Sequence, residues 1–202
     1  MKNLSKIEQS GRSMVEMLGV LAIIGVLSIG GISGYSKAMS KYRVNKTLDQ
    51  ISMLVINIRT LYSSAISYKD LSNAVAVQMG IIPRDMLNTT IKDAGTGEVS
   101  IVNAYSGQVD IGIVENTNDR QFYIVYSGLP QEACVSIATA DWGSQAGSGL
   151  QSVSISESAT GKTKPTSFAN THAIDSLPLT LATAAGECKT EDVGNSIKWT
   201  YY

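Results

Sequence analysis

Residues 11–34 read GRSMVEMLGVLAIIGVLSIGGISG, and this stretch decides the fold. From Met14 to Ile32 it is apolar apart from Glu16 and Ser28, and it is about as long as a helix must be to cross a bilayer. Its glycines weaken helix formation, so the sequence predicts either local unwinding or close helix packing there. The stretch is therefore a candidate membrane span.

The carboxylate of Glu16 distinguishes this span from a simple anchor. An ionisable group within a membrane segment is costly, so it indicates a function and requires a partner. The preceding leader carries Lys2, Lys6 and Arg12, which favours a cytoplasmic leader and translocation of the rest. A cleaved signal peptide is the alternative, but no A-x-A-like cleavage site follows the apolar run.

A second helical pattern continues from the span through residues 35–67. Apolar residues recur there at spacings of three and four, namely Leu48, Ile51, Val55, Ile58 and Tyr62. The polar residues expected off that stripe are Lys46, Asp49, Gln50, Asn57 and Arg59. The sequence thus predicts one long helix whose second half is amphipathic and lies against a globular head.

The junction between leader and span resembles a known processing signature. Gly11, followed by Arg12-Ser13-Met14-Val15-Glu16 and an apolar helix, is similar to the prepilin signature of type IV pilins. The resemblance implies that a prepilin peptidase cuts after Gly11 and methylates the new amino terminus at Arg12. Glu16 then becomes the fifth mature residue and pairs with the terminal amine of a neighbouring subunit. Family members usually have an apolar residue after the cut, so Arg12 leaves the first mature residue open.

The resemblance also implies an architecture and a set of partners. The expected class is α+β, a pilin fold in which a long N-terminal helix packs on an antiparallel β-sheet head. The expected divisions are a leader (1–11), a transmembrane and filament-core half of the helix (12–34), and the amphipathic half with a periplasmic or extracellular head (35–202). The partners implied are further copies of the chain, the prepilin peptidase, an assembly ATPase with its platform, and the inner membrane. The leader length favours the type IVb group or a related pseudopilin.

The head is expected to alternate short helices and strands. We predict helices at 70–79, from Pro130 onward and at 179–185, strands at 99–102, 108–114, 121–126, 152–156 and 196–202, and an exposed loop at 158–166. The first three strands are separated by turn-forming residues and suggest an antiparallel meander on the long helix.

Two cysteines, Cys134 and Cys188, complete the pattern. Neither belongs to a CxxC or Cys/His cluster, so a metal site is not indicated and one disulfide is the economical interpretation. Two unpaired buried thiols are the alternative. A bond between them ties the C-terminal region to the head, as in the cysteine-bounded region of pilins that the resemblance implies.

Neither the composition nor the motifs of the sequence indicate an enzyme. The formal net charge is -1, which disfavours nucleic acid as the main partner. His172 is the single histidine, in a context read as a loop, and the Gly-rich fragments near Gly95 and Gly143 lack a phosphate-binding fingerprint. Scattered acids such as Asp110 and Asp119 have no EF-hand spacing. No cofactor or metal is expected.

The sequence thus favours an exported structural subunit of a type IV pilus-like filament, for adhesion, cell contact or related surface functions. We expect it in the bacterial inner membrane before assembly and in the extracellular pilus afterwards. Two alternatives stay open: a pseudopilin of a type II secretion system, and a membrane-anchored periplasmic binding protein.

Overall fold

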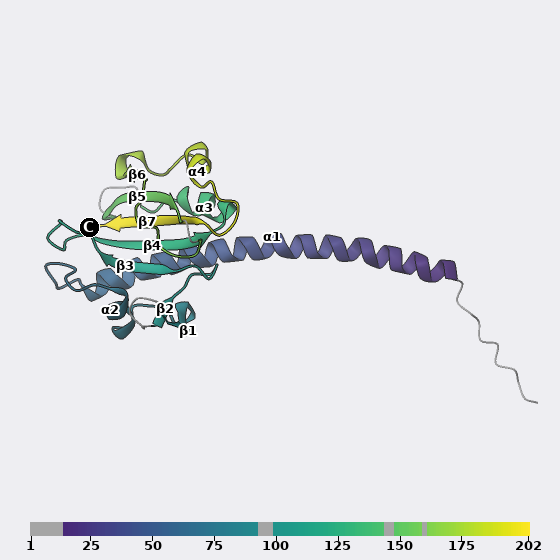
Figure 1. Ribbon diagram of the computed structural model, residues 1–202, viewed down its shortest axis with the longest axis horizontal. Coiled ribbons are helices and arrows are strands. Elements are labelled where there is room, and N and C mark those ends of the chain that lie inside the picture. Colours follow the sequence, from purple (N-terminus) through teal and green to yellow (C-terminus); the bar gives the residue numbers. More distant parts are fainter. Residues whose placement is uncertain (1–13, 93–98, 144–147, 159–160) are drawn as a thin grey trace, which may run out of the picture. The chain divides into compact units, whose positions relative to one another are not determined.

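The computed structural model describes residues 14–92, 99–143, 148–158 and 161–202 (Figure 1). They fall into two compact units, one ending at Lys41 and the other running from Tyr42 to Tyr202. The leader, with Gly11 and Arg12, lies outside the described residues. The expected divisions after residues 11 and 34 therefore remain predictions.

The first element, α1 (Met14–Leu61), is a helix of 48 residues. It contains no proline and is unbroken at Gly25, Gly30 and Gly31, because the glycines lower helix propensity without preventing helical geometry. It ends before the predicted Ser67, so that boundary was wrong. Just beyond the end, the Ser63 hydroxyl donates to the backbone oxygen of Thr60 at 2.8 Å, a local bond that competes with continued helix.

The part of α1 that belongs to the head buries one stripe. Ile51, Leu54 and Ile58 are fully buried, and the other predicted stripe residues pack at its margins. Gln50 was expected off the stripe, and that expectation was wrong. It is only 4 % exposed, and its Nε2 donates to the Oδ2 of Asp85 at 3.0 Å, because a buried amide needs a hydrogen-bond partner.

The head adds short helices and strands to α1. Its helices are α2 (Asn73–Gln78), the 3-10 turns η1 (Arg84–Met86) and η2 (Ile174–Ser176), α3 (Gln131–Ala138) and α4 (Leu181–Glu187). Its strands are β1 (Leu87–Lys92), β2 (Val99–Ile101), β3 (Val109–Ile113), β4 (Phe122–Leu129), β5 (Leu150–Glu157), β6 (Asn170–Ala173) and β7 (Asn195–Tyr201).

Local chemistry explains where the predicted helices begin. The Ser72 side chain caps α2 by accepting from the Val75 N–H at 3.4 Å, and Thr180 caps α4 by accepting from the Thr183 N–H at 3.2 Å. Pro130 stands directly before α3, where a missing N–H costs nothing. Each of these helices is shorter than, or shifted slightly from, its predicted range.

The strands form two antiparallel sheets and not one meander. A five-stranded sheet has the order β3-β4-β7-β5-β6, while β2 pairs with β1 in a separate two-stranded sheet. The expectation that 99–102 joins 108–114 and 121–126 in one meander was therefore wrong. Figure 1 shows the C-terminal strand β7 in the middle of the larger sheet, between β4 and β5. The last segment of the chain thus completes the head.

One face of the five-stranded sheet supplies most of the core. On β7, Ile197, Trp199 and Tyr201 alternate with Ser196, Lys198 and Thr200, so the first set shares one face and the second set the other. The apolar set packs in one cluster with the buried residues of α1 and α3. Trp199 is fully buried and stands edge-on to Tyr126 and Trp142. The predicted α+β fold, a long helix on an antiparallel sheet, is confirmed.

Candidate assembly site

The first half of α1 is an apolar surface with no covering layer from its own unit. Its large apolar residues are each at least 49 % exposed: Met14, Val15, Met17, Leu18, Val20, Leu21, Ile23, Ile24, Val26, Leu27, Ile29 and Ile32. An apolar patch of this extent marks a membrane or protein interaction surface. Within the described residues, α1 is the one helix that is long enough and apolar enough to cross a membrane. Signal sequences share this property.

Glu16 lies in the first turn of α1, on this apolar surface. Its side chain is exposed and has no hydrogen bond or ion pair with any residue in the described part of the chain. The N-terminal end of a helix carries partial positive charge, which favours an acid at this position. The site therefore presents one exposed carboxylate in an apolar surround, without a partner among the described residues. Gly11 and Arg12 cannot be placed beside it, because they lie outside the described residues.

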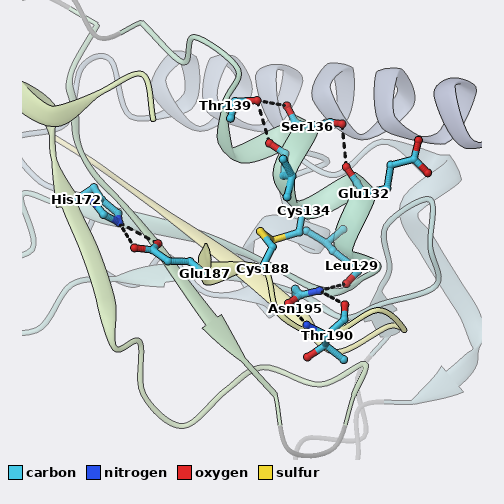
Figure 2. The surroundings of a disulfide bond; sticks show 11 residues. Leu129, Glu132, Cys134, Ser136, Thr139, His172, Glu187, Cys188, Thr190 and Asn195 are labelled. Carbon is cyan, nitrogen blue, oxygen red and sulfur yellow. Dashed lines mark hydrogen bonds and ion pairs between the residues drawn. A yellow bond between two sulfur atoms is a disulfide. The ribbon is translucent and has the colours of Figure 1, made fainter. Parts of the chain in front are cut away.

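The two cysteines meet in the head, in the C-terminal part of the chain. Cys134 on α3 and Cys188 at the end of α4 form a disulfide, with their Cα atoms 5.9 Å apart (Figure 2). Both residues are fully buried. The bond closes a segment whose ends are 54 residues apart and which contains β5 and β6. It therefore fastens the C-terminal region to the helix that follows β4.

His172 was assigned to a loop, and that assignment was wrong. It lies on the edge strand β6, and its Nε2 is 2.8 Å from Oε1 and 2.9 Å from Oε2 of Glu187 (Figure 2). The pair joins β6 to the last residue of α4, Glu187, which directly precedes Cys188. Its geometry gives the histidine a structural partner and no nucleophile to activate.

Asn195 makes a set of structural hydrogen bonds that sequence reasoning missed. Its amide donates to the backbone oxygens of Leu129 at 3.0 Å and Thr190 at 2.7 Å, and its Oδ1 accepts from the Thr190 N–H at 3.2 Å (Figure 2). These bonds hold the start of β7 against the end of β4 and against the loop after α4. The one available signal was an Asn-Ser pair opening a β-rich run, which is too common to single out.

The remaining candidate acids that lie in the described part of the chain form no cluster able to hold a metal ion. Within the described ranges, no three His, Cys, Asp or Glu residues gather as metal ligands. Asp110 is paired with Lys164 and accepts from the Tyr123 hydroxyl at 3.0 Å. Two further acids of the head, Asp93 and Glu98, lie outside the described residues.

Comparison with known proteins identifies the chain's relatives. The PilS N terminal family model matches residues 41–201. The chain is 29 % identical over 204 residues to the major structural subunit of bundle-forming pilus of Escherichia coli O127:H6 (strain E2348/69 / EPEC), covering all of this chain and 97 % of the relative. The protein of the same description from Escherichia coli O111:H- is 28 % identical over 204 residues, with the same coverage.

A solved structure agrees in fold. The type IV b pilin from Salmonella typhi superposes with a TM-score of 0.56 at 21 % identity, covering 78 % of this chain and 98 % of that one. These findings favour a pilus subunit over the secretion pseudopilin and the anchored binding protein. Because the family model covers most of the chain, this protein belongs to the PilS family and is a structural type IV pilin, not an enzyme.

Proposed function

We propose that this protein is the major structural subunit of a type IV pilus, which polymerises through the first half of α1. The observation that carries the proposal is the exposed apolar surface from Met14 to Ile32 with Glu16 within it. Such a surface is stable in water only when lipid or other copies cover it. The relatives described as major subunits of the bundle-forming pilus support a filament as the final cover.

In this proposal the chain is stored in the inner membrane before it is assembled. The apolar half of α1 crosses the bilayer, the basic leader stays in the cytoplasm, and the head is translocated. A prepilin peptidase then cuts between Gly11 and Arg12 and methylates the new terminus. An assembly ATPase and its platform protein move the subunit from the bilayer into the extracellular pilus.

Glu16 guides that transfer by charge. In an apolar surround, the attraction between its carboxylate and the terminal amine of the preceding subunit is far stronger than in water. Leaving either charge unpaired there is costly, so the pair sets the axial register of each incoming subunit. The exposed, unpartnered position of Glu16 in the described residues supports this role.

The name of the relatives also supports a role between filaments. We infer that pili of this protein associate laterally, as the term bundle-forming describes for the pilus of those relatives. We also infer that such bundles bring cells into contact. The head residues, and not the buried core of the filament, then meet other pili or surfaces.

The test replaces Glu16 with glutamine in the native host. Glu16→Gln keeps the shape of the side chain and removes its charge, while Asp49→Asn makes the same change at an exposed acid of the head half of α1. Filaments are counted by electron microscopy, and intact mass with N-terminal sequencing reports the cut.

We expect Glu16→Gln to accumulate as cleaved, membrane-bound, filament-free protein, and Asp49→Asn to assemble normally. Normal filaments from Glu16→Gln would refute the proposed pairing. A wild-type chain that keeps its leader, or is cut after the apolar run, would refute the pilin processing.

A further inference from the structure

The face of the five-stranded sheet that points away from the core is hollowed into a polar groove. The groove has a volume of about 640 Å³ and lies between the strands and the segment from Lys164 to Phe168. Its lining includes the accessible hydroxyls of Ser152 and Thr171, while Ser154 beneath them is buried and hydrogen-bonded to Thr171 at 2.9 Å. This size is within the range of small-ligand sites. The groove therefore has the dimensions and the hydrogen-bonding groups of a binding site.

Tyr123 forms one wall of this groove. Gly112 is its cross-strand partner, and a side chain there would collide with the Tyr123 ring, so the glycine leaves room for it. The ammonium groups of Lys164 and Lys198 lie 4.7 Å and 5.0 Å from the ring centroid. An aromatic face attracts cations, and it thus holds two lysines at one place.

The two lysines differ in how their charges are balanced. Lys164 is paired with Asp110, and although burial lowers its pKa, bonds to Asp110 and Tyr123 raise the pKa overall. Lys198 has only ring contacts, with Tyr123 and with Phe168 at 5.8 Å, and forms no ion pair within the described residues.

Lys198 is thus a cation held where its charge is costly. Burial lowers its pKa, and the nearby charge of Lys164 lowers it further. Among the described residues that line the groove, the acid is Glu115, which forms no ion pair with Lys198. A carboxylate placed beside Lys198 would relieve both the desolvation and the repulsion, and charge-assisted bonds of this kind are strong.

We propose that this groove binds an acidic sugar at the end of a surface glycan, with its carboxylate on Lys198. The accessible hydroxyls of Ser152 and Thr171 bond the sugar hydroxyls, and the Phe168 ring covers its apolar face. A contact with another subunit fits less well, because the centre of a protein interface is depleted of charge and rich in apolar side chains. The site is independent of filament formation.

The experiment measures binding to the full chain in detergent micelles by saturation-transfer NMR. The probes are glucuronic acid and its methyl ester, which has the same ring but no charge. Lys198→Met removes the ammonium with similar length, Lys198→Arg keeps a cation, and Lys189→Met changes an exposed lysine that does not line the groove. Tryptophan fluorescence checks that each variant retains its fold.

We expect glucuronic acid to bind at least about tenfold more tightly than its ester, and Lys198→Met to remove that preference. Lys198→Arg should retain most of it, and Lys189→Met all of it. Equal binding of acid and ester to the wild type would overturn the proposal. An unchanged acid preference in Lys198→Met would also overturn it. If the wild type shows no acid preference and Lys198→Met fails to assemble filaments, the groove is a subunit contact and the proposal is likewise overturned.

Discussion

The two halves of α1 treat apolar side chains in opposite ways. From Met14 to Ile32 the large apolar residues are all at least 49 % exposed, whereas the head half has a stripe on which Ile51, Leu54 and Ile58 are fully buried. The head half thus uses its apolar surface inside the chain to stabilise one fold. The first half leaves its apolar surface for lipid or for other copies of the chain.

This difference separates stability from assembly. Substitutions in the head core should change the free energy of unfolding, and substitutions in the first half of α1 should change association instead. Each prediction below either breaks that separation or sharpens it.

The largest effect on stability is expected at the centre of the core. Trp199 is fully buried between Tyr126 and Trp142, so Trp199→Ala should lower the free energy of unfolding by about 3–5 kcal/mol. Ile24→Ala, which is 52 % exposed in the wild type, should leave it within about 0.5 kcal/mol. Denaturant unfolding of the detergent-solubilised chain, followed by tryptophan fluorescence, measures both. Comparable losses in the two variants would break the separation.

The next effect concerns the bond between α3 and α4. Replacing Cys134 and Cys188 together with alanine should destabilise the head by about 2–4 kcal/mol, because the unfolded chain regains the freedom of a long loop. Limited proteolysis should show faster cleavage between the two positions. The matched control is dithiothreitol, which should destabilise the wild type and leave the double variant unchanged. A double variant as stable as the wild type would assign the bond no part in the head's stability.

The sequence predicted well those features that depend on local pattern. The apolar span, the stripe through Ile51 and Ile58, the short helix within 70–79 and the β-rich run at the C-terminus were all readable, because helix and strand periodicities are written in adjacent residues. Glu16 was noticeable for the same reason, as an acid in an apolar run.

Features that depend on distant partners were not readable. The strand that carries His172 forms only by pairing with β5, and the pairing of β2 with β1 replaces the expected meander. Gln50 is buried because Asp85 lies opposite it, a contact across 35 residues. The groove around Lys198 needs five strands and a loop in register, so nothing near Lys198 in the sequence points to it.

A smaller effect is expected at the start of β7. Asn195→Ala leaves the buried carbonyl of Leu129 without its donor and should cost about 1–3 kcal/mol of unfolding free energy. Asn45→Ala makes the same exchange on an exposed position of α1 and should change stability by less than about 0.5 kcal/mol. Thermal unfolding by circular dichroism compares the two. A larger loss from Asn45→Ala than from Asn195→Ala would contradict the assigned bonds.

The smallest effect is expected at the contact between the head half of α1 and the 3-10 turn η1, where Asp85 accepts hydrogen bonds from α1. Burial raises the pKa of Asp85, but hydrogen bonds from Lys46 and Gln50 outweigh it and hold the pKa below its usual value of 3.8. A lowered folded pKa adds stability above that usual value, and the gain is lost as the pH falls through the folded pKa.

Because Asp85 is 46 % exposed, the gain should stay below about 1 kcal/mol. Wild type should therefore exceed Asp85→Asn in stability at neutral pH, and the gap should close in acid. Urea titrations from about pH 7 to about pH 2 measure this, and a gap that does not narrow in acid would show that the contact is steric and not electrostatic.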